Sequence, residues 1–141
     1  MLECSPVLRL GLRLLVAASV LVWTAGGTSA GPLNNLAGSE WGFAGETDEH
    51  ARYLRFGDHG QVGGMLGCNH FRGRYSFKNG ELRIGPLANT LIACPSPMMK
   101  REKEFLTMLE DTRLADARRR KLVLKDAYGE VLAELVRRNG D

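Results

Sequence analysis

Alternating apolar and polar residues run through much of the chain after residue 38 and predict a series of short β-strands. The clearest alternation flanks Asn79-Gly80, where residues 72–77 and 81–84 place apolar side chains at every second position. Asn-Gly adopts the positive φ angles that a tight turn needs, so these segments are predicted to form a hairpin. Gly85-Pro86 is expected to end its second strand. Further strands are expected at residues 39–43, 52–56, 62–66, 121–125 and 130–136.

One segment has a period of about 3.6 residues instead, and it predicts an amphipathic helix of about four turns that runs to about Asp111. Ser96 is the expected N-cap, and Pro97 suits the first turn. One face of this helix carries Met98, Glu102, Phe105, Leu109 and Thr112. Glu102 interrupts the apolar face, and we expect it to accept hydrogen bonds from a neighbouring loop or arginine, with a functional role as the alternative. A single helix packed on hairpin-linked strands defines the α+β class with a dominant antiparallel sheet.

Three methionines lie on or near this helical segment, at positions 98, 99 and 108. Met side chains fill irregular gaps, so we expect these three in the core. The alternative is that they line a ligand cavity at the opening of the sheet.

The first thirty residues have the pattern of a secretory signal peptide. Arg9 and Arg13 precede an uninterrupted apolar run at residues 14–23, and small residues ending in Thr28-Ser29-Ala30 follow it. The apolar run is too short for a membrane span, which needs about 20 residues. We therefore predict a signal peptide at residues 1–30, cleaved after Ala30, and a mature domain at residues 31–141. The mature protein is expected to be periplasmic or secreted.

The chain has three cysteines, and removal of the signal peptide would take Cys4 with it. Cys68 and Cys94 then remain, an even number in a compartment where disulfides persist, so a disulfide is favoured. The alternatives are a metal pair, a reactive thiol and two buried free cysteines. Zinc would need four ligands, and Cys68, His70 and Cys94 supply three without C-x-x-C spacing. A Cys68 nucleophile would need a base and an orienting group, and no acid partner is recognisable. We therefore assign no catalytic residue, metal or cofactor.

Charge adds little to this picture. The formal net charge is +3, and both signs are mixed along the chain, which argues against a nucleic-acid partner. The one basic cluster, residues 118–121, is predicted to be a solvated hairpin loop. Weak contact with anionic lipid headgroups is the alternative. The length fits one domain, and a monomer is expected.

Two blocks of the sequence resemble those of a known family. Residues 67–75, Gly-Cys-Asn-His-Phe-Arg-Gly-Arg-Tyr, resemble its Gly-Cys-Asn-x-Phe-x-Gly-x-Tyr block, and residues 87–94 resemble its Leu-Ala-x-Thr-x-x-x-Cys block. The family is the META domain, also called HslJ-like, and the resemblance extends over residues 36–137. The matching motif positions are Gly67, Cys68, Asn69, Phe71, Gly73, Thr90, Cys94 and Glu102. His70 stands where relatives often have arginine. Some relatives are lipoproteins, but this N-terminus lacks a cysteine at the cleavage site.

The resemblance implies an open or cracked β-barrel with a helix across its opening. It also implies a location in the bacterial envelope or outside the cell, and associations with stress tolerance, motility and virulence. No catalytic activity is established for the family. The sequence-based hypothesis is therefore a non-enzymatic binding or structural module that recognises an unknown protein or a small apolar ligand. The alternative is a thiol-dependent enzyme or redox protein that uses Cys68 and Cys94.

Overall fold

The computed structural model describes residues 32–140, and the predicted signal peptide at residues 1–30 lies outside this range. Within the described range the chain forms eight strands, one α-helix and one short 3-10 turn. The elements are β1 (Glu40–Gly42), β2 (Tyr53–Phe56), η1 (Asp58–Gly60), β3 (Gln61–Met65), β4 (His70–Lys78), β5 (Glu81–Asn89), α1 (Ser96–Asp111), β6 (Leu114–Ala117), β7 (Lys121–Lys125) and β8 (Val131–Arg137).

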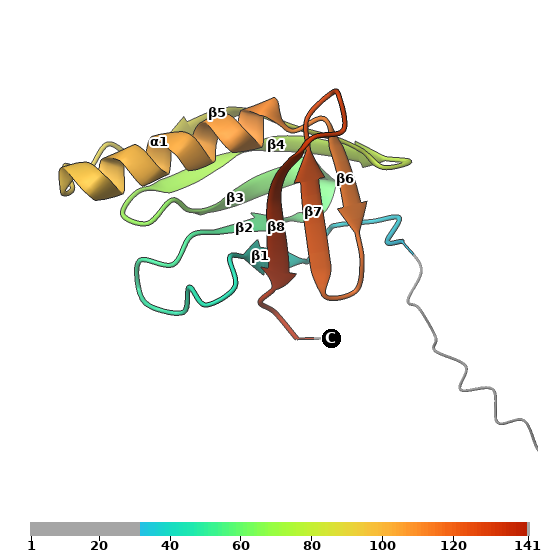
Figure 1. Cartoon of the computed structure of the whole chain (residues 1–141), viewed down its shortest axis with the longest axis horizontal. Coiled ribbons are helices and arrows are strands. Elements are labelled where there is room, and N and C mark those ends of the chain that lie inside the picture. Colours follow the sequence, from blue (N-terminus) through green and yellow to red (C-terminus); the bar gives the residue numbers. More distant parts are fainter. Residues whose placement is uncertain (1–31, 141) are drawn as a thin grey trace, which may run out of the picture.

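The strands form a closed barrel in which each strand pairs antiparallel with the next one along the chain, and β8 returns to pair with β1 (Figure 1). The barrel and its single helix confirm the predicted α+β class. Its narrowest junction lies between β5 and β6, where the only paired residues are Glu81 and Leu114. The backbone N–H of Leu82 also donates to Arg113 O, at 2.9 Å. Helix α1 connects these two strands along the chain. The predicted opening of the barrel is therefore a narrow junction that a few backbone hydrogen bonds close.

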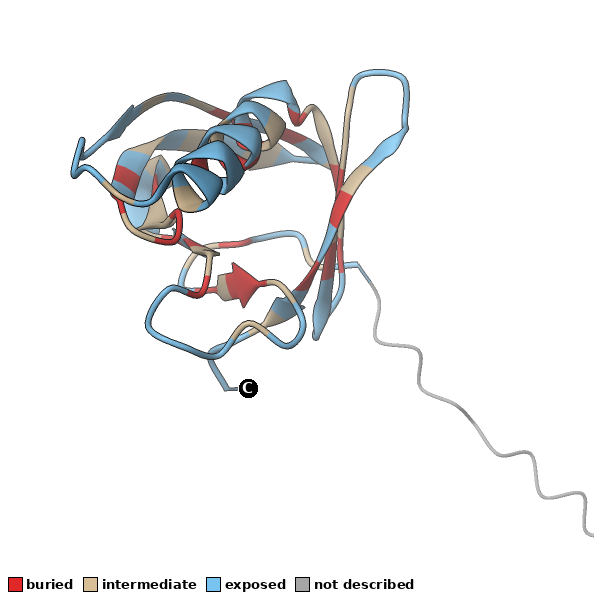
Figure 2. Cartoon of the chain, turned by 60° about the vertical axis from the view of Figure 1, so that its left-hand side comes forward, coloured by how far each residue is buried: buried red, intermediate tan, exposed pale blue. Residues whose placement is uncertain are grey.

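The interior of the barrel is filled by side chains. Figure 2 colours the buried residues red, and they recur along the strands. Eight strands enclose a space just wide enough for the side chains that point inward. Alternating residues of every long strand supply them, and the largest fully buried ones are Trp41, Leu54, Phe56, Leu82, Leu122, Leu124 and Leu135. The indole N–H of Trp41 donates to Ser39 Oγ at 2.7 Å, which satisfies the one polar atom of that side chain. The barrel therefore encloses a packed core.

Helix α1 lies across β4 and β5 and closes one side of the core (Figure 1). The ring of Phe105 meets the rings of Phe43 and Phe71 edge to face, with centroids 5.5 and 6.3 Å away. The predicted end of the helix near Asp111 is confirmed, and its predicted inner face is too, because Glu102, Phe105, Leu109 and Thr112 are buried. The predicted N-cap was wrong. Ser96 is the first helical residue, and Pro95 occupies the cap position without a side-chain hydrogen bond.

Two predictions about the strands were wrong. Strand β5 does not end at Gly85-Pro86 but continues to Asn89. Tyr75 pairs with Ile84 and Gly73 with Leu87, so two residues of β5 oppose Arg74 alone. This is a β-bulge, a place where a strand tolerates a proline because the ladder is already interrupted. Strand β6 was not predicted at all, because its four residues, Leu-Ala-Asp-Ala, include no β-branched or aromatic side chain.

The methionines are less buried than predicted. Met98 and Met108 are half-buried, and Met99 is exposed. Met99 comes one residue after Met98, so it is turned by about 100° around the helix axis, away from the inner face.

The predicted hairpin between β4 and β5 is confirmed. Lys78 pairs with Glu81, which leaves Asn79 and Gly80 as a two-residue turn. Both have positive φ, 52° at Asn79 and 83° at Gly80, as this kind of turn requires. The register places Leu82 and Ile84 in the core, and a slip of one residue would move both to the wet face.

Replacing Gly80 with valine should therefore lower the free energy of unfolding by about 1–3 kcal/mol, because a β-branched residue adopts a positive φ only under strain. Gly57→Ala, at a glycine with negative φ, is the comparison. Gly57 has a φ of −89°, and an added Cβ would lie 3.5 Å from its nearest neighbours, so this change should cost less. Urea denaturation of both variants measures the difference. A Gly80→Val protein as stable as the wild type would contradict the assigned role of the turn.

Candidate functional site

The two motif blocks meet at a turn formed by residues 66–69, here called the cysteine turn. It closes through a 2.8 Å hydrogen bond from Leu66 N to Asn69 O. Gly67 has a φ of 128°, which a residue with a side chain rarely adopts, so glycine is needed at this point. The turn directs two consecutive backbone N–H groups, those of Cys68 and Asn69, toward one acceptor. Successive N–H groups that converge in this way form a concave anion-binding site.

The anion in this site is the carboxylate of Glu102 from α1. Its Oε1 accepts from Cys68 N at 2.7 Å and from Asn69 N at 2.6 Å, and its Oε2 accepts from Asn69 Nδ2 at 2.9 Å. Glu102 is only 4% exposed, so these donors take the place of water. This confirms the expectation that Glu102 accepts hydrogen bonds from a neighbouring loop.

These hydrogen bonds determine the protonation state of Glu102. Burial alone would raise the pKa of the carboxyl, but the bonds from the Asn69 side chain and from the backbone of Asn69 and Cys68 outweigh it. The pKa therefore lies below its usual range, and the group is a carboxylate at neutral pH.

Asn69 connects the cysteine turn to residues 90–95, here called the apolar loop. Its Oδ1 accepts from Ile92 N at 2.7 Å and from Thr90 Oγ1 at 2.8 Å. Its Nδ2 donates to Ile92 O at 3.1 Å as well as to Glu102. The side chain is 1% exposed, and both its oxygen and its nitrogen are fully used. An aspartate or a leucine at position 69 would leave several of these partners unsatisfied.

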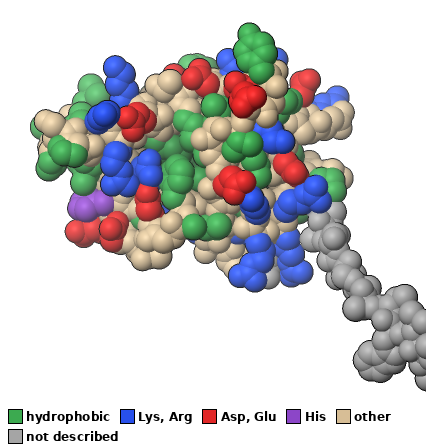
Figure 3. Space-filling view, viewed as in Figure 1, with side chains coloured by type: hydrophobic (Ala, Val, Ile, Leu, Met, Phe, Trp, Pro, Cys, Tyr) green, Lys and Arg blue, Asp and Glu red, His purple; other side chains and the backbone are tan. Residues whose placement is uncertain are grey.

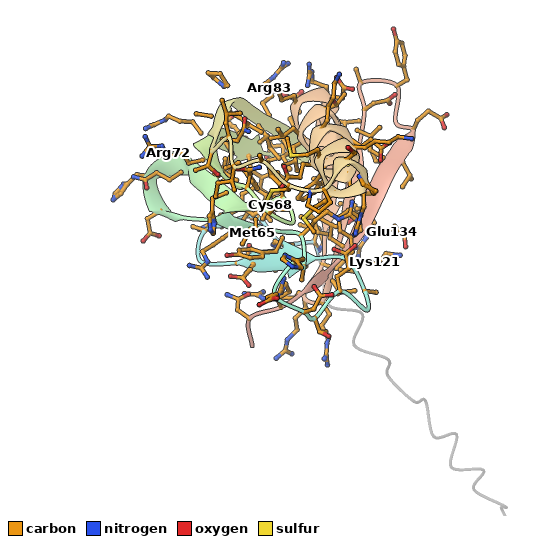
Figure 4. The ribbon with its side chains drawn as sticks, turned by 90° about the vertical axis from the view of Figure 1, so that its left-hand side faces the viewer. Met65, Cys68, Arg72, Arg83, Lys121 and Glu134 are labelled. Carbon is orange, nitrogen blue, oxygen red and sulfur yellow. A yellow bond between two sulfur atoms is a disulfide. The ribbon has the colours of Figure 1, made fainter. Side chains whose placement is uncertain are left out.

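A disulfide between Cys68 and Cys94 adds a covalent link between the same two segments, with Cα atoms 6.5 Å apart. The favoured pairing of these cysteines is therefore present in the structure. Figure 4 shows Cys68 beneath the helix, whereas Arg72 of β4 points away from the barrel. The cysteine turn, the apolar loop and α1 are thus joined to one another by one covalent bond and a set of buried hydrogen bonds.

Six of the eight predicted motif residues gather in this cluster: Gly67, Cys68, Asn69, Thr90, Cys94 and Glu102. The other two lie further along β4 and serve the fold. Phe71 is in the core, and Gly73 faces β5 so closely that a Cβ would lie 2.6 Å from Pro86 O. The backbone of Ile92 also belongs to the cluster, and no motif position pointed to it.

The structure places His70 outside the cluster of ligand atoms considered for zinc. His70 is exposed at the start of β4, and its backbone N–H donates to Thr90 Oγ1 at 3.1 Å. The ligand-type atoms that do come together are the two sulfurs and a Glu102 oxygen, all within 4.8 Å. Zinc binds thiolates, and the two sulfurs are bonded to each other, so this oxidised cluster does not fit the metal.

A second, more exposed contact ties the loop before β2 to the helix. Glu46 forms ion pairs with Arg52 at 2.5 Å and with Arg101 at 3.0 Å. The guanidinium of Arg52 also lies 4.1 Å from the centroid of the Phe43 ring. Burial opposes ionisation of Glu46, but its hydrogen bonds to Arg52 and the nearby positive charges lower its pKa. Sequence reasoning missed this contact. Arg101 is 55 positions from Glu46 along the chain, and no motif marks the nearer pair of Glu46 and Arg52.

Comparison with known proteins agrees with this geometry. The META domain family model matches residues 34–139, so the chain belongs to the META domain family. An NMR structure of a protein from Burkholderia xenovorans has 20% sequence identity and a TM-score of 0.62, over 74% of this chain and 85% of that one. A second NMR structure has 23% identity and a TM-score of 0.55, over 73% and 90%. These structures share the fold. No curated protein matches the chain. Within residues 32–140 no helix is long and apolar enough to cross a membrane.

The role of Glu102 can be tested with Glu102→Gln, which should lower the free energy of unfolding at pH 7 by about 2–4 kcal/mol. A neutral amide is a weaker acceptor, and its own N–H₂ would face other donors. Glu104→Gln is the control, because Glu104 lies on the same helix but is exposed. Its ion pair with Lys100 is long, at 3.9 Å, and lies in water. Its effect should stay below about 0.5 kcal/mol.

The difference in the free energy of unfolding between wild type and Glu102→Gln should depend on pH. The unfolded chain has a glutamate pKa of about 4.3, above the lowered native value, so it takes up the proton first as the pH falls. The stability that Glu102 contributes is therefore fully present above the unfolded-state pKa. It is lost as the pH falls through the lowered native pKa. Denaturation at several pH values should show the gap between wild type and Glu102→Gln narrowing in acid. A constant gap would argue against a buried carboxylate.

The disulfide predicts a non-additive result. Cys68→Ala and Cys94→Ala should each destabilise the protein by a similar amount, about 3–4 kcal/mol on the chain-entropy model. The double variant should cost little more than either single one, because both remove the same bond. Thermal melts without reductant measure this. Strictly additive losses would show that the two cysteines act independently.

Proposed function

We propose that this META-domain protein is a periplasmic or secreted, non-enzymatic binding module that supports stress tolerance or virulence at the bacterial envelope. In this proposal the cysteine cluster is a structural brace, and recognition takes place on the outer surface. The observation that carries it is the saturation of the cluster: the Cys68 sulfur is bonded to Cys94, and Glu102 already holds three donors.

The filled interior favours a surface site over an enclosed one. Trp41, Phe56 and the leucines around them occupy the space in which a small apolar ligand would otherwise lie. A partner protein, a membrane surface or an apolar ligand would therefore meet the outside of a scaffold that does not need to open. We propose that the protein acts as a monomer and without a cofactor.

The alternative remains a thiol-dependent enzyme or redox protein. It requires Cys68 or Cys94 to be a free and reactive thiol during function. Because the disulfide is only half-buried and adjoins a loop, a reductant could reach it. The two functions therefore differ in the state of the cysteines in the native compartment.

One measurement tests both the predicted export of the protein and the redox state of Cys68 and Cys94. The full-length chain is expressed in a bacterium, the periplasmic and external fractions are alkylated before any reduction, and the intact mass is determined. We expect the mass of residues 31–141, with no alkyl group added until the protein is denatured and reduced. A retained segment 1–30 in a cytoplasmic fraction would overturn the proposed location. Rapid alkylation of one native cysteine would favour the thiol-dependent alternative.

A further inference from the structure

The apolar loop exposes two large aliphatic side chains at one end of the molecule. Leu91 is 86% exposed and Ile92 is 55% exposed. Met99, in the first turn of α1, is 38% exposed at the same end. Figure 3 shows hydrophobic side chains gathered there, at the left-hand end near the start of the helix. Leu91, Ile92 and Met99 are called the apolar tip below.

The backbone that carries the apolar tip is held firmly. Both the N–H and the C=O of Ile92 are bonded to the buried Asn69 side chain, and the disulfide fixes Cys94 two residues later. An isolated exposed hydrophobic side chain is ordinary. Here, however, a buried polar network and a covalent bond hold two adjacent aliphatic side chains out in water. Such preorganisation lowers the entropy lost when these side chains enter another apolar environment.

Basic residues lie next to the apolar tip. Lys100, Arg101 and Lys103 occupy the second turn of α1, directly after Met99. Arg101 pairs with Glu46, and Lys100 lies 3.9 Å from Glu104. Within residues 32–140, Lys103 has no ion-pair partner. These side chains therefore place positive charge beside the apolar tip.

We propose that the apolar tip inserts into the interface of an anionic lipid bilayer while Lys100 and Lys103 contact the headgroup phosphates. This inference rests on the proposed envelope function and names the surface that it recognises. Aliphatic side chains beside cations are the composition that binds such interfaces. A stable protein–protein interface needs about 800 Å² per partner, well beyond what three side chains expose. Figure 3 shows acidic side chains lower on the same end, so the helix side would face the membrane.

Cosedimentation of the mature protein with vesicles tests this directly. We expect binding to phosphatidylcholine vesicles that contain phosphatidylglycerol and much weaker binding to phosphatidylcholine alone. Leu91→Ser combined with Ile92→Ser should weaken partitioning by about tenfold or more, the factor expected from losing the burial of two aliphatic side chains. Tyr128→Ser with Val131→Ser is the control. Those residues are 92% and 56% exposed but lie in the turn between β7 and β8 and on β8, so binding should not change.

Charge variants separate this surface from the other basic cluster. Lys100→Gln with Lys103→Gln should reduce binding to the anionic vesicles several-fold, whereas Arg118→Gln with Arg120→Gln should not. All these side chains are exposed, so unchanged thermal melts will show that the variants are folded. An Ile92→Trp protein adds a direct reading: its emission should shift to the blue on anionic vesicles, and that of Tyr128→Trp should not.

Three results would overturn the inference. These are no binding of the wild type to anionic vesicles, full binding by the Leu91/Ile92 variant, or loss of binding only in the Arg118/Arg120 variant. The first would leave a protein partner as the occupant of the apolar tip. Failure here is distinguishable from failure of the proposed function, because intact mass reports export and cysteine state whether or not the purified protein binds lipid.

Discussion

A buried carboxylate with three N–H partners determines how the helix sits on this barrel. Transferring Glu102 out of water is unfavourable, and only the correctly formed cysteine turn supplies enough donors to compensate. The helix is therefore positioned by a polar requirement as well as by the packing of Phe105. Because the turn and the apolar loop share Asn69, a disturbance at any of the three segments leaves buried polar groups without partners in the others.

The parts of the fold with a strong local signal could be predicted from the sequence. Residues 96–111 combine the helical period with Pro97, and Asn79-Gly80 selects one kind of turn, so both elements were predicted with nearly correct bounds. The cysteine cluster was predicted in part. The motif positions were selected by resemblance and the disulfide by parity, but neither reveals that Asn69 uses its side chain to hold the backbone of Ile92.

The elements that escaped prediction depend on contacts across the barrel. Strand β6 has weak intrinsic β-propensity, and it is a strand because β7 offers four register partners. The path of β5 through Pro86 is decided by the bulge opposite Arg74, which local sequence does not show. Met99 and Met98 are adjacent and chemically identical, and only the rotation of the helix over the sheet determines which one is exposed.

Closure of the barrel through β1 and β8 has a consequence for how the chain reaches its native state. Trp41 lies beside Arg137, so the first strand obtains its second neighbour from the opposite end of the sequence. A chain that emerges from a ribosome starting at its N-terminus carries β1 with one unpaired edge until β8 has also emerged. Open strand edges recruit other chains. Strand β1 has only three residues, which keeps that edge short during the interval.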